Sequence, residues 1–194
     1  MKQSLLMQHG AYKKMKGCHL VGKSQKKSGL GEWAKLILVA LLIAFFLRSF
    51  VFVTSVVDGE SMEPALEDGE VVLFNKFTYL FNDAERGDIV IINKPRKSYV
   101  KRIIGLPGET VSATEQGLYI DGKKYEQSFI TKANKNSTGN FGPVKVPKDS
   151  YFVMGDNRKL SKDSRNGLGF ISKEDVAGKS ELIILPIDEW SMTN

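Results

Sequence analysis

Residues 99–109 read Tyr-Val-Lys-Arg-Ile-Ile-Gly-Leu-Pro-Gly-Glu, and this stretch is the clearest indication of the fold class. Its first six residues are rich in aromatic and β-branched side chains, which favour a strand. Residues 105–108, Gly-Leu-Pro-Gly, have the composition of a turn that ends the strand. Because successive side chains of a strand point to opposite faces, Tyr99, Lys101 and Ile103 share one face. The stretch therefore predicts a strand that carries a lysine between large neighbours.

Short apolar runs separated by turn residues recur on both sides of this stretch. An Asp121-Gly122 pair follows one of the runs and is a strong signal for a tight hairpin turn. Residues 127–147 are polar and rich in Asn, Lys and Gly, which indicates a long surface loop or a small subdomain. We therefore expect a mostly β body, with further strands at residues 71–74, 89–92, 117–120, 151–154 and 182–185.

Positive charge is concentrated at the N-terminal end of the chain. The 194 residues have a formal net charge of +6, but residues 1–35 hold eight lysines and one acid and carry +7. Residues 36–194 hold 20 Lys and Arg against 21 acids and carry −1. A nucleic-acid-binding domain would carry its positive charge on its own folded surface. The charge distribution therefore argues against nucleic acid as a partner and indicates a basic tail over residues 1–32.

A long apolar segment follows this tail. Residues 36–47 are a run of 12 apolar residues. As a helix they would cover roughly 18 Å, short of a hydrocarbon core of about 30 Å, whereas a helix from Trp33 to Val53 would cover roughly 31 Å. Arg48 would then lie near the outer end, where its side chain can reach the lipid headgroups. We therefore expect a transmembrane anchor over residues 33–53.

Two alternatives remain for this segment, a cleavable signal peptide and a buried core helix. A signal peptide needs small residues soon after its apolar core, whereas residues 48–52, Arg-Ser-Phe-Val-Phe, are bulky and charged. The lysines before the segment predict a cytoplasmic N-terminus. The expected arrangement is a single-pass protein of the cell membrane with an extracytoplasmic β-rich domain over residues 54–194.

Histidine and cysteine occur only in the tail, at His9, Cys18 and His19. The expected outer domain therefore cannot hold a Ser-His-Asp triad, a cysteine nucleophile or a zinc site built from nitrogen and sulfur ligands. We expect no metal and no other cofactor. If this domain is a hydrolase, its remaining choices are a pair of carboxylates or a serine or threonine that a lysine activates.

Lys101 and Ser61 are the candidates for such a pair. Burial of Lys101 between its strand neighbours would lower its pKa from about 10.4 toward the 7–8 of a useful base. The alternative is an amphipathic lysine whose amine stays in water. Ser61 lies in a turn marked by Gly59 and Pro64, where its own N–H can help to bind an oxyanion. The alternative here is an ordinary turn serine, and the local pattern leaves both alternatives open.

Four motifs follow one another behind the apolar segment. They are Gly-Glu-Ser-Met-Glu-Pro at 59–64, Arg-Gly-Asp-Ile-Val at 86–90, residues 99–109, and Gly-Asp-Asn-Arg at 155–158 with Ser161, residues 163–165 and Gly169. In this order they resemble the motifs of the type I signal peptidases, especially the short form of Gram-positive bacteria. The resemblance begins at Trp33 and extends to the end of the β body. It implies a mostly antiparallel β-sheet catalytic body of the signal-peptidase or LexA-like type behind one transmembrane helix.

The resemblance also implies a mechanism and a substrate class. Ser61 attacks the scissile carbonyl, and neutral Lys101 accepts its proton, delivers it to the leaving amine and then activates the water that hydrolyses the acyl-enzyme. The substrates would be exported precursor proteins that carry signal peptides, cut after small residues in the first and third positions before the cut. Met62 would help to line one of the two pockets that read these residues.

Supporting roles follow from the same resemblance. Ser161 matches the serine that orients the lysine. Arg102 with Asp156, and Asp163 with Arg165, match structural ion pairs; taken alone, neighbouring opposite charges usually form weak surface pairs. One position departs from the pattern: some relatives carry a serine, where this chain has Gly59, whose hydroxyl completes the oxyanion hole. The second oxyanion donor is therefore left unassigned.

Two rival interpretations are another Ser-Lys protease with a similar fold and, from a different class, a protein without catalytic activity. The self-cleaving LexA-like repressors resemble the chain around the Ser-Lys pair, but they are soluble and carry a DNA-binding domain, against which the apolar segment and the charge distribution speak. A non-catalytic β module tethered to the membrane would need neither Ser61 nor Lys101.

Overall fold

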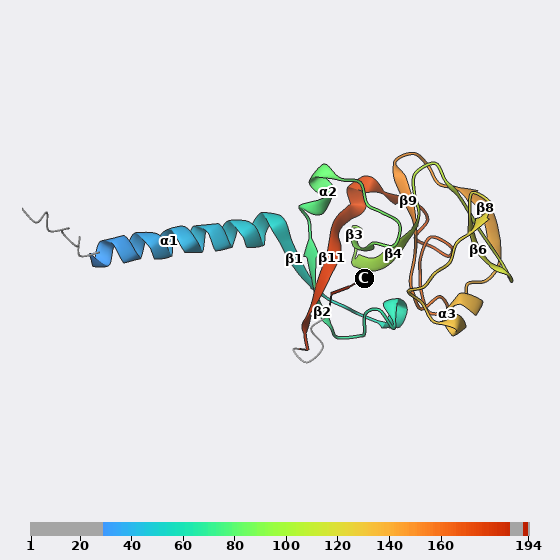
Figure 1. Ribbon diagram of the computed structural model, residues 1–194, viewed down its shortest axis with the longest axis horizontal. Helices are drawn as coiled ribbons and strands as arrows, with labels where there is room; N and C mark the ends of the chain where they lie inside the picture. Colours follow the sequence, from blue (N-terminus) through green and yellow to red (C-terminus); the bar gives the residue numbers. More distant parts are fainter. Residues whose placement is uncertain (1–28, 187–191, 194) are drawn as a thin grey trace, which may run out of the picture. The chain divides into compact units, whose positions relative to one another are not determined.

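The computed structural model describes residues 29–186 and 192–193 (Figure 1). The expected basic tail, residues 1–32, lies almost entirely outside the described residues. The chain divides into two compact units, residues 1–39 and 40–194. The described elements, in chain order, are α1 (Leu30–Phe46), η1 (Leu47–Val51), β1 (Phe52–Val56), η2 (Glu60–Met62), β2 (Val71–Asn75), α2 (Thr78–Phe81), β3 (Ile89–Asn93), β4 (Ser98–Gly105), β5 (Thr110–Thr114), β6 (Gly117–Ile120), β7 (Lys123–Lys124), α3 (Lys132–Asn136), β8 (Phe141–Lys145), β9 (Ser150–Met154), β10 (Ile171–Ser172), η3 (Lys173–Asp175) and β11 (Val176–Leu185).

The apolar segment is helical over different limits from those expected. α1 has 17 residues and leads into η1, a π-helical turn of five residues. Strand β1 begins at Phe52, which lies opposite Asn75 of β2. The expectation of one helix from Trp33 to Val53 is therefore wrong, because sheet pairing with β2 takes Phe52 and Val53 out of the helix. Among the described residues, no helix combines the length and the apolar character needed to cross a membrane.

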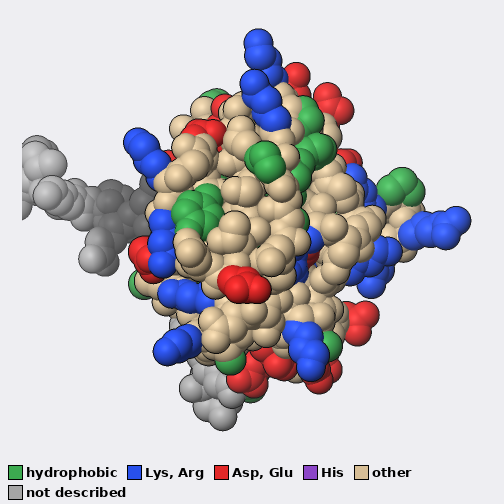
Figure 2. All heavy atoms as spheres, turned by 90° about the vertical axis from the view of Figure 1, so that its right-hand side faces the viewer, with side chains coloured by type: hydrophobic (Ala, Val, Ile, Leu, Met, Phe, Trp, Pro, Cys, Tyr) green, Lys and Arg blue, Asp and Glu red, His purple; other side chains and the backbone are tan. Residues whose placement is uncertain are grey.

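The strands between residues 52 and 185 form two antiparallel sheets in the described part of the chain. The larger has seven strands in the order β1-β2-β11-β3-β4-β9-β10, and the smaller has four in the order β7-β6-β5-β8. In Figure 1, β6 and β8 lie at the side of the body away from β1. Viewed from that side, the surface shows basic and acidic side chains interspersed rather than gathered by sign (Figure 2). The expectation of a mostly antiparallel β body is confirmed.

The expected strands coincide with β2, β3, β4, β6, β9 and the last part of β11. The Asp121-Gly122 turn also forms as expected, with positive φ at both residues and β7 following it. Residues 127–147 are only partly a surface loop: they contain α3 and also β8, which pairs with β5 as an edge of the smaller sheet. Neither β5 nor β8 was expected, because β5 has only two apolar residues, Val111 and Ala113, and β8 contains Gly142-Pro143.

Three clusters of buried apolar side chains make up the core. One lies under the turn that carries Ser61 and includes Val57, Met62, Leu66, Phe74 and Ile91. A second joins the smaller sheet to β4 and β9, and a third packs Val90, Ile92 and Ile103 against Tyr151 and Val153. Because β4 carries residues into both of the latter clusters, its position is fixed from two sides.

Candidate active site

Ser61 lies in the short 3₁₀ turn η2, one loop beyond β1. Gly59 enters this turn with φ +92°, a backbone conformation that side chains with a Cβ rarely adopt, and its N–H donates to Asp68 Oδ1 at 2.7 Å. Met62, with 1% of its surface exposed, anchors the turn in the core below. The turn is therefore fixed on both sides of Ser61, whose side chain lines a cleft described below.

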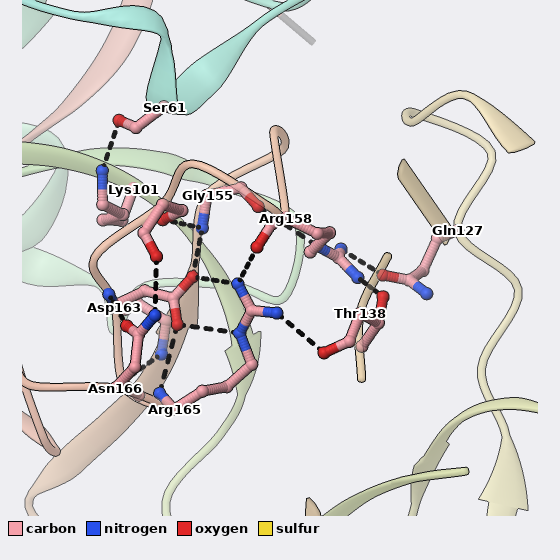
Figure 3. Close-up of polar contacts among 12 residues, drawn as sticks. Ser61, Lys101, Gln127, Thr138, Gly155, Arg158, Asp163, Arg165 and Asn166 are labelled. Carbon is pink, nitrogen blue, oxygen red and sulfur yellow. Dashed lines mark hydrogen bonds and ion pairs between the residues drawn. The ribbon is translucent and has the colours of Figure 1, made fainter. Parts of the chain in front are cut away.

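Lys101 reaches this hydroxyl from β4. Lys101 is 3% exposed, and its Nζ donates to Ser61 Oγ at 2.6 Å (Figure 3). It also donates to the carbonyl oxygen of Val100 at 2.7 Å. Burial lowers the pKa of Lys101 from 10.5 to about 8, while the carboxylates of Asp163 and Asp156 act in the opposite direction. An amine with this pKa is present partly in its neutral form near neutrality, which lets it accept a proton from the serine.

Arg102 and Asp156 form a buried ion pair one residue further along β4. The side chains are 2% and 1% exposed, and Arg102 Nη2 lies 2.7 Å from Asp156 Oδ2. Arg102 also donates to the carbonyl oxygen of Gly87 at 2.7 Å and stacks on the ring of Phe129. The pair fastens the loop after β9 to β4, at the point where that loop meets the serine turn.

Asp163 and Arg165 form the second ion pair, at 2.8 Å. Asp163 is fully buried, and its Oδ2 also accepts the N–H of Gly155 at 3.1 Å (Figure 3). Ser161 accepts the same N–H at 3.1 Å, and no hydrogen bond joins Ser161 to Lys101 among the described residues. The orienting contact that the resemblance implied for Ser161 is thus not formed in this structure, where the carbonyl oxygen of Val100 holds the amine instead.

The serine turn and the loop after β9 are in direct contact. The carbonyl oxygen of Ser61 accepts the N–H of Asn157 at 3.1 Å. A Cβ built on Gly155 would collide with that same carbonyl oxygen and with Ser161 Oγ. Glycine at position 155 therefore allows the close approach that brings the two segments together.

Sequence reasoning missed the part of this network that reaches the segment between β7 and β8. Arg158 is buried and donates to Thr138 Oγ1 at 2.9 Å, to Gln127 Oε1 and to the carbonyl oxygen of Gly155. Burial lowers the pKa of Arg158 to about 10. The position of Arg158 in the last motif, near Asp156, indicated that it supports the site. Gln127 and Thr138 lie in a polar stretch, and nothing in its sequence pattern marks them as partners of Arg158.

A cleft of about 490 Å³ opens over the Ser61–Lys101 pair. Along one side run residues 98–101 of β4, which pair with β3 and, within the described residues, have no strand on their other edge, because β9 joins β4 only from Arg102 onward. The opposite side is formed by the end of β1 and by η2. Apolar and aromatic side chains that line the cleft include Val56, Met62, Tyr99, Val100 and Leu160. The cleft therefore offers two backbone edges to an extended peptide.

No group of three or more His, Cys, Asp or Glu side chains that could bind a metal is found among the described residues. Within the cleft, the hydroxyl of Ser61 lies beside the amine of Lys101.

The known proteins with similar sequences that are given below are all signal peptidases. The family model for signal peptidase, peptidase S26, matches residues 30–185. Signal peptidase I P of Bacillus subtilis subsp. natto is 46% identical over 175 residues, which cover 86% of this chain and 95% of that protein. Signal peptidase I S of Bacillus subtilis (strain 168) is 45% identical over 177 residues, with coverage of 87% and 96%. A crystal structure of a signal peptidase I from Enterococcus faecalis V583 is 35% identical, covers 50% of this chain and 97% of that one, and gives a TM-score of 0.43.

The family model and the Bacillus relatives define a hydrolase of the serine peptidase class. The family match runs from α1 to the last residue of β11 and so includes the whole cleft. The chain belongs to the signal peptidase family, peptidase S26, and its relatives are type I signal peptidases of Gram-positive bacteria. The resemblance drawn from the four motifs is confirmed.

Proposed function

We propose that the protein is a membrane-bound endopeptidase that removes N-terminal signal peptides from exported precursors with Ser61 as nucleophile and Lys101 as general base. The observation that carries this proposal is the 2.6 Å contact between Lys101 Nζ and Ser61 Oγ. Burial supports it as well, because a lysine in water would hold its proton at neutral pH.

The mechanism has two halves. Lys101 takes the proton of Ser61 as the hydroxyl attacks the scissile carbonyl, and it gives this proton to the leaving amine. Water then hydrolyses the acyl-enzyme, with Lys101 again as the base. Ser161, Asp163, Arg165, Arg102 and Asp156 support the site by holding the loop after β9 against the serine turn, and they touch no reacting atom.

The oxyanion that forms in each half needs hydrogen-bond donors. The N–H of Ser61 is the first, and the second remains unassigned. Because residue 59 is glycine, it has no hydroxyl that could donate a hydrogen bond to the oxyanion. Its N–H already donates to Asp68. A water molecule or another backbone N–H from the cleft would have to complete the hole.

Binding of an extended peptide in the cleft is supported by the free edge of β4. A precursor segment added there would form backbone hydrogen bonds and turn alternate side chains toward the floor of the cleft. Met62 and its apolar neighbours suit small side chains at the first and third positions before the cut, whereas the side chain between them would point away.

Attachment to a lipid bilayer is supported by the surface of α1. Large apolar side chains are exposed around the whole helix, among them Trp33, Leu36, Ile37, Leu41 and Phe45, each at least 58% exposed. A helix that is apolar on all sides is stable in a hydrophobic surrounding and not in water. We infer that the helical stretch from Leu30 to Val51 anchors the protein, with the basic tail in the cytoplasm and the β body on the extracytoplasmic side.

The pH dependence of the reaction tests the assignment of Lys101. The neutral amine is the active form, so kcat/KM should be low when Lys101 is protonated and rise with pH through a pKa of about 8. A lysine exposed to water would place the same rise near 10.5. The measurement is cleavage of a precursor peptide by the full chain in detergent between pH 6 and pH 10. A profile without a rise in this range would rule out Lys101 as the base.

The substrate class is tested with an exported precursor whose signal peptide ends in small residues. Replacing the residue directly before the cut with Trp should abolish cleavage at that bond, because a pocket that accepts small side chains does not accept an indole. The same replacement at the second position before the cut is the matched control and should leave cleavage within a fewfold of the original. Mass determination of the products locates the bond, and cleavage that tolerates Trp equally at both positions would refute the proposed specificity.

A further inference from the structure

The cleft over the catalytic pair is open along β4 on one side of Lys101 and closed on the other. Residues 98–100 pair with β3 on one edge and carry no strand on the other edge within the described residues. From Arg102 onward that second edge is taken by β9, where Arg102 lies opposite Met154. A substrate that lies along residues 98–100 therefore cannot follow β4 past Lys101. Its chain beyond the cut has to pass over the segment that follows β9.

The segment that follows β9, residues 155–162, lies against the serine turn. The N–H of Asn157 donates to the carbonyl oxygen of Ser61 at 3.1 Å, and Gly155 lies close to the catalytic pair (Figure 3). Ser161 is 2% exposed and fixes the segment from within by accepting the N–H of Gly155 at 3.1 Å. This segment is therefore the wall of the cleft at the end where β4 is closed.

Two side chains of this wall, one on each side of buried Ser161, line the cleft. Leu160 is one of them, and it is 57% exposed although it is a large apolar residue. Lys162 is the other, and its methylene groups lie over Gly167, where an added Cβ would come within 2.9 Å of Lys162 Cε. The stem of a lysine covers its surroundings with apolar atoms. The closed end of the cleft therefore presents an apolar wall centred on Leu160.

We propose that Leu160 is a specificity residue that contacts the substrate residue directly after the cut and favours an apolar side chain there. This inference rests on the proposed function, in which the residues before the cut lie along the free edge of β4. An apolar side chain at this position buries surface of Leu160 that otherwise faces water, which is favourable. The contact is made to the half of the substrate that leaves with the amine. It therefore favours binding and formation of the acyl-enzyme, and it has no part in hydrolysis of the acyl-enzyme.

The test is a double-mutant cycle between the protein and its substrate, with the full chain in detergent. Two precursor peptides differ only in the residue directly after the cut, which is Leu in one and Ser in the other. Each is cleaved by the unaltered protein and by Leu160→Ser, and kcat/KM is measured for the four combinations. We expect the unaltered protein to prefer the Leu peptide roughly fivefold. Leu160→Ser should remove this preference, because the two side chains that form the contact are then no longer both apolar.

Two controls accompany the cycle. Leu80→Ser makes the same change at an exposed leucine of α2 that does not line the cleft, and it should keep both the activity and the preference of the unaltered protein. A second pair of peptides carries Leu or Ser at the fifth position before the cut, which lies toward the free end of the cleft. The ratio of kcat/KM for this pair should be the same for the unaltered protein and for Leu160→Ser.

Three results would overturn the inference and leave the proposed function standing. The unaltered protein could cleave the Leu and Ser peptides equally well. Leu160→Ser could slow both peptides by the same factor, which would mean that the residue only holds its loop in place. Leu160→Ser could change the ratio for the pair that differs before the cut, which would mean that the substrate lies in the opposite direction. Failure of the unaltered protein to cleave any of the four peptides would refute the proposed function, and this inference with it.

Discussion

Replacing Ser61 with Ala is expected to lower precursor processing by on the order of 10³-fold or more, because the variant lacks the oxygen that attacks the scissile bond. Lys101→Met should cause a loss of similar size, since Ser61 then has no group within hydrogen-bond distance to take its proton. Residues that act as one unit are not additive, so Ser61→Ala combined with Lys101→Met should be no slower than either single variant. The measurement is single-turnover cleavage of a signal-peptide-bearing precursor by the full chain in detergent.

The comparison needs a control for folding. Burial of Lys101 disfavours its charged form, so a methionine of similar length in its place should not lower the stability of the fold at neutral pH. Lys145→Met, on the exposed edge strand β8, is the matched change outside the cleft and should keep full activity. If Ser61→Ala or Lys101→Met processed precursor at the normal rate while remaining folded, the pair would not be the catalytic dyad.

The local sequence pattern predicted the strands whose own residues are mostly apolar. It missed the strands whose few apolar side chains are buried by residues from other parts of the chain. Residues 117–120 and 151–154 alternate or accumulate apolar side chains, and β6 and β9 form there. β5 and β8 gain their burial from Phe152 and Tyr125 across the second cluster, which the sequence of each strand does not reveal. The limits of the N-terminal helix failed for a similar reason, because pairing with β2, about twenty residues later, decides where the helix ends.

The candidate site shows the same division. The strand pattern could predict that Lys101 is placed among large neighbours, but not that a serine 40 positions earlier lies within 2.6 Å of it. The ordered motifs supplied that pairing. They did not reveal the contacts of Arg158 with Gln127 and Thr138, which lie 31 and 20 positions away. These partners are ordinary polar residues in sequence, and only the folding of the segment between β7 and β8 brings them to Arg158.

Loss of Asp156 is the change with the largest expected effect on stability. Asp156→Ala should lower the free energy of unfolding by about 3–5 kcal/mol, because it leaves the buried guanidinium of Arg102 without its counter-charge. The exposed pair of Lys173 and Asp83 is the control: Asp83→Ala should cost at most about 1 kcal/mol, although the two nitrogen–oxygen distances are equal at 2.7 Å. Urea unfolding of the full chain in detergent, followed by circular dichroism, measures both.

The electrostatics of the pair sharpen this prediction. Burial raises the pKa of Asp156 even though Arg102 acts against the shift, so the attraction between the two groups does not fully offset the loss of their hydration. Arg102→Met combined with Asp156→Leu should therefore recover most of the stability that Asp156→Ala loses. It should not recover the rate of precursor processing, because the pair also holds Asn157, whose N–H binds the carbonyl oxygen of Ser61. A double variant that is stable and fully active would mean that packing alone positions the serine turn, and a double variant as unstable as Asp156→Ala would mean that the pair itself contributes net stability.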